Sequence, residues 1–400
     1  MTDTTEKGVD SRRVQAKTSF INDPKFRAFF YQAALVIAVL GLFLWLWMNA
    51  ATNLAAQGRA TGFAFLGQSS GFNISFSLIP FDRTSSYLQV YFVGILNTLL
   101  VAAVGIVLAT FLGFAVGIAR LSKNVLIRAL AAVYIEIIRN VPLLLQLIFW
   151  YFLSLNALPV VRESLALPGG IVANRRGVSF PQPIFDDRFI WVALVAVVAL
   201  TVALVMRRRT LKQIETTGDR RSVWLPFFGV LIVPVVAAFF LTGTQVQFSF
   251  PELTGFNYTG GWTAPPELTA LILGLVLYTA AFIAEIVRAG IQSVNYGQTE
   301  AAAALGLKDS DRLNLVIIPQ AMRVIVPPLT SQYLNLTKNS SLGAAIGFPE
   351  LVNVFVGTAL NQSGRAIEII GLTMLVYLTL SLVTSIFMNW YNARVALVER

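Results

Sequence analysis

The chain has 400 residues, of which 56% are hydrophobic and only 12% are charged, whereas an average soluble domain carries about 25% charged residues. This composition indicates an integral membrane protein, and no polar block is long enough to fold as a separate domain. There is no cysteine and no histidine, which excludes disulfides, thiol chemistry, imidazole catalysis and the usual zinc sites. The net charge of +10 indicates membrane orientation rather than nucleic-acid binding, because the basic residues flank apolar runs.

The apolar runs predict an all-α protein with about eight membrane spans. Residues 1–28 are polar and basic, and the run that follows, Phe29 to Asn49, is longer than the apolar core of a signal peptide and lacks an evident small-residue cleavage site. We therefore expect an uncleaved first span. A further crossing is expected between Leu313 and Gly347, where charges and prolines interrupt the pattern. The other runs begin near Leu88, Ile127, Phe189, Trp224, Leu268 and Ile367.

Lysine and arginine predict how these spans are oriented. With eight spans, 21 basic residues fall on one side of the membrane and 7 on the other, and two lie within spans. Because loops rich in these residues stay in the cytoplasm, both termini are expected to be cytoplasmic. The two long loops on the opposite side, residues 50–87 and 156–188, are rich in Gly, Ser, Pro and aromatic residues, and we expect them to form ordered caps.

A stripe of small residues runs along the second predicted span. Gly105, Ala109, Gly113 and Gly117 recur every four residues, so they lie on one face of a helix. Such a stripe lets another helix approach closely. It predicts either a seam with a second subunit or helix bundle, or close packing within this chain.

Three places within the spans carry polar or ionisable side chains, and a charged side chain there costs about 2.5–3.5 kcal/mol on insertion scales. A proline breaks the helix at the first of them, and broken helices near the middle of a membrane commonly line a solute path. Each place also has a plainer interpretation, an intrahelical ion pair or a head group that reaches the membrane surface. The residues are Glu136, Arg139, Asn140 and Pro142 in "YIEIIRNVPLLLQ", Glu285 and Arg288 in "AEIVRAG", and Lys338, Asn339, Ser340 and Ser341 in "LTKNSSLGAAIGFPE".

Catalytic chemistry finds little support in the sequence. There is no G-x-x-x-x-G-K-[ST] phosphate loop, and no carboxylates cluster with metal-ligand spacing. We therefore expect neither an enzyme nor a bound cofactor or metal. Any energy must come from a partner protein or from an ion gradient.

A helix, a corner and a second helix are predicted in the polar loop between residues 297 and 321. Glu300 to Leu305 is strongly helix-forming, with Thr299 as the expected N-cap. Gly306 suits the left-handed position that ends a helix, and a second helix can begin at Asp309 or Ser310. A simple connector would not need so much helix propensity, so this loop is predicted to dock a cytoplasmic protein.

This loop resembles the EAA loop of ATP-binding-cassette importer permeases, whose pattern is E-A-A-x3-G-x9-I-x-L-P. Val316 and Ile318 depart from that pattern only by aliphatic exchanges. Four other segments resemble the polar-amino-acid branch of these permeases, which imports histidine, glutamine and arginine. They are "GILNTLL", "YIEIIRNVPLLLQLIFWY", "YTAAFIAEIVRAGIQSVNYGQ" and "LNLTKNSSLGAAIG". The resemblance covers roughly residues 91–390, interrupted by about 157–266, which short members of the branch lack.

The resemblance implies a type I importer fold in the bacterial inner membrane and a permease for L-amino acids. A long chain with an N-terminal cap is similar to the first permease subunit of general L-amino-acid importers and of glutamate/glutamine/aspartate/asparagine importers. Such a subunit pairs with a second permease, which suggests a heterodimer surrounded by membrane lipid. Two copies of an ATPase bind ATP beneath the pair, and a periplasmic protein delivers the amino acid.

The resemblance also assigns domains and site residues. It divides the chain into a cytoplasmic tail (1–28), a first span with a periplasmic cap (29–90), a transmembrane domain (91–390) with two spans inserted at about 157–266, and a tail (391–400). The residues that it places in ATPase coupling are Glu300, Ala301, Ala302, Gly306, Leu307 and Pro319. Those near the transport path are Glu136, Arg139, Asn140, Pro142, Lys338, Asn339 and Ser341.

One alternative is a secondary amino-acid transporter driven by an ion gradient. The carboxylate of Glu136 would then couple the ion to the solute. Such transporters commonly contain inverted repeats, and no repeat of fixed period is visible in this sequence. Together with the EAA loop, this favours the ATP-driven importer.

Overall fold

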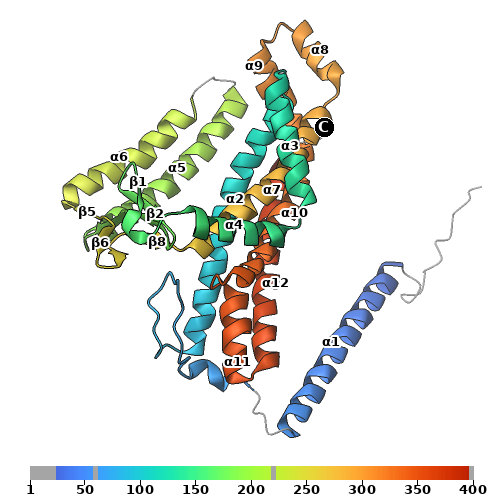
Figure 1. Ribbon diagram of the computed structural model, residues 1–400. Coiled ribbons are helices and arrows are strands. Elements are labelled where there is room, and N and C mark those ends of the chain that lie inside the picture. The colour runs from blue at the N-terminus through green and yellow to red at the C-terminus, as the bar shows by residue number, and fades with distance from the viewer. Residues whose placement is uncertain (1–23, 57–61, 218–221, 396–400) are drawn as a thin grey trace, which may run out of the picture.

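The computed structural model describes residues 24–56, 62–217 and 222–395 (Figure 1). Within them, seven helices are long and apolar enough to cross a membrane, or eight if one bent pair counts as a single span. The predicted helical class and number of spans are therefore confirmed. Most of the predicted tail 1–28 and half of the tail 391–400 lie outside the described residues. The long helices are α1 (Pro24–Ala56), α2 (Tyr87–Arg120), α3 (Val125–Asn140), α4 (Leu143–Ala157), α5 (Phe189–Thr217), α6 (Trp224–Thr242), α7 (Pro266–Gln292), α10 (Ile318–Asn339) and α12 (Ala366–Val395).

Shorter segments connect these helices. We call the end of the bundle that carries the projecting α8 and α9 the α8 end, and the opposite end, where α2 begins, the cap end (Figure 1). The short helical segments are η2 (Phe63–Gly67), η3 (Val161–Glu163), α8 (Tyr296–Ala304), α9 (Asp309–Arg312), the π-helical η4 (Leu313–Ile317), the 3-10 helix η5 (Ser340–Ile346), the π-helical η6 (Val352–Ala359) and α11 (Leu360–Ser363).

The core of the bundle is formed where α2 packs against α7, and α7 is the most enclosed of the candidate spans, with 61% of its apolar window buried. The small-residue stripe makes this packing possible. A Cβ atom on Gly113 would lie 2.6 Å from Ile283 of α7, and one on Gly117 would lie 2.8 Å from the carbonyl oxygen of Ala284. Between the two interpretations of the stripe, the structure supports close packing within this chain.

The helix break predicted at Pro142 separates α3 from α4, which meet at an angle of 107°. A proline has no N–H and cannot continue the hydrogen bonding of the preceding turn. The side-chain amide of Gln146 compensates, because it donates to the carbonyl oxygens of Ile138 at 2.8 Å and Val141 at 2.9 Å. The bend is thus held by a buried side chain from the helix that follows it.

The crossing expected between Leu313 and Gly347 is a helical span from Asp309 to Ile346. It passes from α9 through the π-helical η4 into α10, and it stays helical through Pro327 and Pro328. After η5, Gly347 adopts a left-handed conformation with φ +80°. The chain then continues through η6 and α11 toward the cap end and returns in α12 (Figure 1).

Between α4 and α7 the chain forms the α5–α6 hairpin and a group of short strands. Four strands form an antiparallel sheet in the order β1-β2-β3-β8, in which Val178 lies opposite Ala264 just before α7. None of these strands was predicted from the sequence. They are β1 (Leu165–Leu167), β2 (Ile171–Asn174), β3 (Gly177–Phe180), β4 (Gln182–Phe185), β5 (Val246–Ser249), β6 (Glu252–Thr254), β7 (Asn257–Thr259) and β8 (Trp262–Ala264).

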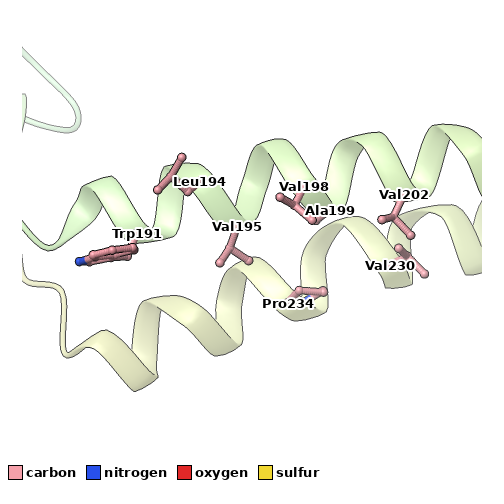
Figure 2. Close-up of a pocket in the computed structure, with 8 residues that line it drawn as sticks. All are labelled: Trp191, Leu194, Val195, Val198, Ala199, Val202, Val230 and Pro234. Atoms are coloured by element: carbon pink, nitrogen blue, oxygen red, sulfur yellow. The ribbon is translucent and has the colours of Figure 1, made fainter.

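Two parts of the structure expose apolar helices. α1 lies apart from the bundle, and none of its apolar window is buried (Figure 1). α5 and α6 pack on one another, and an apolar groove of about 390 Å³ runs between them (Figure 2). It is lined by Trp191, Leu194, Val195, Val198, Ala199, Val202, Val230 and Pro234. Apolar surface of this kind is expected where helices meet lipid or other spans.

Candidate functional site

α8 projects from the end of the bundle and forms the first arm of the predicted helix–corner–helix (Figure 1). It begins at Tyr296, where the side chain of Asn295 accepts the N–H of Gly297 at 2.8 Å. The predicted N-cap, Thr299, is therefore wrong, because Asn295 offers the same kind of capping oxygen four residues earlier. Starting there gives the helix nine residues instead of five or six.

The corner after α8 is built as predicted. Gly306 has φ +75°, and its N–H donates to the carbonyl of Ala303 at 2.9 Å. The N–H of Leu307 donates to the carbonyl of Ala302 at 3.2 Å. This pair of bonds is a Schellman motif, which satisfies carbonyls at a helix end and requires a left-handed residue. α9 then begins at Asp309, one of the two predicted starts.

The outer surface of this loop is exposed and carries two large apolar side chains among charged ones. Glu300 and Ala301 are exposed, whereas Ala302 faces inward and is only 3% exposed. Tyr296 is 72% exposed and Leu305 is 81% exposed. Large apolar side chains in this position have no partner within the described part of the chain, and such surfaces commonly mark interaction sites.

The return from the loop is a stiff helix. Leu307 is half-buried at the corner, and Pro319 lies in the first turn of α10, directly after the π-helical η4. All the residues predicted for coupling thus lie in one loop and its return.

The first group predicted near a transport path lies on the outside of this chain's bundle. Glu136, Arg139, Asn140 and Pro142 are all exposed at the end of α3. Arg139 does not pair with Glu136; its guanidinium lies 5.1 Å from the ring centroid of Phe282 on α7. Asn140 donates to the backbone carbonyl of Glu136 at 2.7 Å. The bend therefore presents charged and polar groups away from the core.

The second group predicted near a path lies at the end of α10 and the start of η5, and η5 packs against α4, the helix that follows the first group. Lys338 is exposed, and Asn339 and Ser341 are half-buried. The hydroxyl of Ser341 donates to the carbonyl of Lys338 at 2.7 Å, inside the last turn of the span. The structure thus brings α4, which begins just after the bend, next to η5, although the two elements are far apart in sequence.

The third place, Glu285 and Arg288, is an ion pair. The guanidinium of Arg288 forms a salt bridge with the carboxylate of Glu285 one turn earlier, and its Nε lies 3.0 Å from Oε2. Arg288 also donates to Gln292. The plainer interpretation of this motif, an intrahelical ion pair, is therefore confirmed.

Two of the buried polar residues that were not predicted from the sequence meet at one break in the chain. Asn97 of α2 is 0% exposed and donates to the carbonyls of Phe76 at 2.9 Å and Pro349 at 2.8 Å. Glu350 is also 0% exposed; its carboxylate accepts N–H groups at the start of η6 and the hydroxyl of Tyr377 at 3.0 Å. Together they fasten the break between η5 and η6 to α2, to α12 and to the segment before α2.

A signal for both residues was present in the sequence. Asn97 is one of two polar residues within "GILNTLL", and Glu350 ends "LTKNSSLGAAIGFPE". A polar residue inside an apolar run is costly unless it is hydrogen-bonded. This cost marks both residues for a structural or functional role, but it does not identify their partners.

Comparison with known proteins identifies the class of protein. Residues 222–397 match the family of binding-protein-dependent transport system inner membrane components. The chain is 49% identical over 383 residues to the general L-amino acid transport system permease protein AapQ of Rhizobium johnstonii, covering 96% of this chain and 95% of the relative. It is 39% identical over 411 residues to the glutamate/glutamine/aspartate/asparagine transport system permease protein BztB of Rhodobacter capsulatus, covering 95% and 96%.

A solved structure is also similar. The crystal structure of an amino acid ABC transporter with histidines matches with a TM-score of 0.45 and 20% identity, over 77% of this chain and 95% of that one.

The chain belongs to the family of binding-protein-dependent permeases of the inner membrane. It is a multi-pass membrane protein and a transport subunit, not an enzyme in its own right. Permeases of this kind work with a second permease, an ATPase and a binding protein. The predicted resemblance is therefore confirmed at the level of the family.

Proposed function

We propose that this chain is a permease subunit of an ATP-binding-cassette importer that carries L-amino acids into the cytoplasm. The observation that carries the proposal is the 49% identity to a general L-amino acid permease over 96% of the chain. The relative named for glutamate, glutamine, aspartate and asparagine supports the same substrate class. Under this proposal a second permease of different sequence completes the membrane unit, and a periplasmic binding protein delivers the substrate.

The exposed loop around α8 supports a role in ATPase docking. Its outer surface combines Glu300, Ala301 and the exposed Leu305, while Gly306 fixes the angle to the next helix. From Asp309 the chain is helical as far as Ile346. A push on α8 would therefore reach the bundle as a rigid-body movement. ATP is bound by the partner ATPase, and this chain needs no cofactor. The α8 end and both termini are then cytoplasmic.

The charged groups at the α3–α4 bend and at η5 support a path on one side of the bundle. Glu136, Arg139 and Lys338 are exposed in this chain, and charged groups that face lipid are costly. They are better accommodated against a second permease or a water-filled path between the two subunits. An amino-acid zwitterion offers a carboxylate and an ammonium group, so both signs of charge would be useful there.

Reconstitution tests this function. The chain would be co-purified with the permease, ATPase and binding protein encoded beside it and placed in proteoliposomes. Uptake of labelled glutamate, glutamine or leucine is expected only with ATP and the binding protein. Uptake by the chain alone, driven by a sodium or proton gradient, would instead establish the secondary transporter.

A matched pair of variants tests the docking surface. Leu305→Asp places a charge on the exposed corner and is expected to abolish co-purification of the ATPase. Leu253→Asp makes the same change at an exposed residue of β6, away from the loop, and serves as the control. Equal ATPase recovery in both variants would contradict docking at α8.

A further inference from the structure

An apolar cavity of about 610 Å³ lies between the helices at the α8 end of the bundle. Its volume falls within the range of about 300–1,000 Å³ that is typical of ligand sites. Ser122 is the one polar side chain among its lining residues. The walls come from three helices and include Phe114 and Ile118 of α2, Val287 and Ile291 of α7, and Met322 and Ile325 of α10.

A corner rich in positive charge borders this cavity. The segment that joins α2 to α3 supplies Leu121 and Ser122 to the lining, and Ile127 follows in the first turn of α3. Arg120 at the end of α2, Lys123 in the turn and Arg128 at the start of α3 lie along the same segment. The guanidinium of Arg128 lies 3.4 Å from the carbonyl oxygen of Ser122, which places it at the rim.

These three cations form no salt bridge with an acidic side chain in the described parts of the chain. Glu285, on the neighbouring α7, attracts Arg120 at longer range, but its carboxylate is engaged by Arg288. Asp309 is likewise engaged by Arg312. The corner is therefore a positive patch next to an apolar cavity.

We propose that this cavity binds one anionic phospholipid, with an acyl chain between α2, α7 and α10 and its phosphate at the Arg120–Arg128 corner. Phe114 and Ile118 lie inside a helix that is apolar enough to span the membrane, so the lining is at the depth of lipid chains. Basic residues at the membrane surface attract anionic head groups, by about 1 kcal/mol for each lysine or arginine.

The chemistry of the lining favours a lipid over the other candidate occupants. A small polar ligand needs several convergent polar groups, and the lining offers only one such side chain. A soluble ATPase would meet the exposed apolar residues of α8 before it reached a cavity that extends into the spans. An acyl chain needs no hydrogen bonds, and its phosphate matches the cations of the corner.

The position of the cavity means that a bound lipid would affect the joint between the α8 loop and the bundle. Leu313 of η4 and Ile318 of α10 also line it, and these residues join the α8 loop to the bundle. A bound lipid would fill the space beneath this joint and stiffen it. The effect on transport rests on the proposed function, whereas lipid binding itself does not.

Retention of lipid by the full-length purified chain tests the proposal. The chain would be exchanged into detergent with equal amounts of phosphatidylglycerol and phosphatidylethanolamine, and the bound lipid would be counted by native mass spectrometry. We expect one retained phosphatidylglycerol. Lys123→Gln and Arg128→Gln are each expected to weaken retention about fivefold. Ile118→Trp, which fills the cavity from an exposed position, is expected to remove the lipid while leaving the charges.

Arg208→Gln combined with Arg209→Gln is the matched control, because both residues are exposed on α5 and neither lines the cavity. An equal loss in this control would show nonspecific attraction and overturn the proposal. So would unchanged retention in Ile118→Trp, provided that the variant elutes as a monodisperse peak. A cross-link from the cavity to the ATPase in the assembled complex would identify a protein as the occupant and also overturn it. If lipid retention follows the variants but reconstituted uptake is absent, only the proposed function fails.

Discussion

Glycine and alanine serve opposite purposes in two regions of this molecule. On α2 they form a buried stripe; Ala109 is 0% exposed, and a Cβ on Gly113 would be 2.6 Å from Ile283. At the α8 loop they form a projecting helix and its corner: Ala301 of the helix is exposed, and Gly306 of the corner has open space around it. The stripe uses the absence of a side chain to let two helices touch. The loop uses helix propensity and a left-handed backbone instead.

The difference shows what small residues can mean in a membrane protein. Lipid provides little hydrophobic drive between helices, so close van der Waals contact must hold a bundle together. A small residue in such a seam should tolerate no added atom. At the corner after α8, only the backbone conformation should matter. Variants at the two kinds of position can therefore separate packing from conformation.

The largest effect is expected from Gly113→Val. The new Cβ would overlap the side chain of Ile283 and lie 3.0 Å from the carbonyl oxygen of Ala280. Overpacking costs typically 1–3 kcal/mol and occasionally more, and the backbone contact puts this case at about 3 kcal/mol. Thermal unfolding followed by size-exclusion chromatography should show a large fall in Tm. Ala115→Val, on the exposed side of α2, should not. Equal behaviour of the two variants would contradict the packing role of the stripe.

A somewhat smaller effect is expected from Asn97→Ala, at the cap end of the same helix. The change removes two hydrogen bonds and leaves the buried carbonyls of Phe76 and Pro349 without this donor. A buried polar group left unpaired costs about 1–3 kcal/mol. Differential scanning fluorimetry should show a lower Tm, whereas Asn156→Ala, at an exposed residue of α4, should be nearly neutral. A neutral Asn97→Ala would mean that other groups fasten the η5–η6 break.

Gly306→Val is expected to lower folding stability less than the two preceding variants, but to impair transport specifically. A residue with a Cβ pays about 1–2 kcal/mol in the left-handed conformation. Gly306 has φ +75°, and no neighbouring atom lies within 4 Å of the position that a Cβ would take. The bundle should remain folded, while the angle between α8 and α9 changes and ATP-driven uptake falls. Gly306→Asn should retain most uptake, because asparagine tolerates this conformation. Equal loss in both variants would point to crowding by a partner rather than to backbone conformation.

The sequence predicts those parts of the structure that depend on neighbouring residues alone. Apolar length fixed the spans, and the glycine at the end of a helix-forming run fixed the corner at Gly306. Thr299 and Asn295 both carry a capping oxygen, and local sequence does not rank the two, so the N-cap of α8 at Asn295 is not predictable from it. The strands in the insertion were missed because they are only three or four residues long, too short for a clear alternating pattern.

Contacts between distant segments could not be predicted. The stripe on α2 offered no indication that its partner was Ile283, 170 positions away, rather than a second subunit. Glu136 and Glu285 share the same spacing to an arginine, yet only Glu285 forms the ion pair. The guanidinium of Arg139, one turn after Glu136, lies over the ring of Phe282 instead. A chain of this length contains many equivalent pairings, and only tertiary packing selects among them.

The smallest effect on stability is expected from Asp82→Asn. Asp82 lies in an exposed turn before α2, where the change affects neither helix packing nor a left-handed backbone position. The side-chain hydroxyl of Thr84, with backbone N–H groups of Thr84 and Ser85, lowers the pKa of Asp82 below its ordinary value of 3.8. Because the folded-state pKa is lowered, the stabilising effect of the charge is present above pH 3.8 and is lost as the pH falls through the lowered value. Hydrogen exchange of this turn should be faster in the variant than in the wild type at about pH 6, and the difference should shrink toward about pH 3. If the difference does not change with pH, then neutral hydrogen bonds, and not the charge of the carboxylate, stabilise this turn.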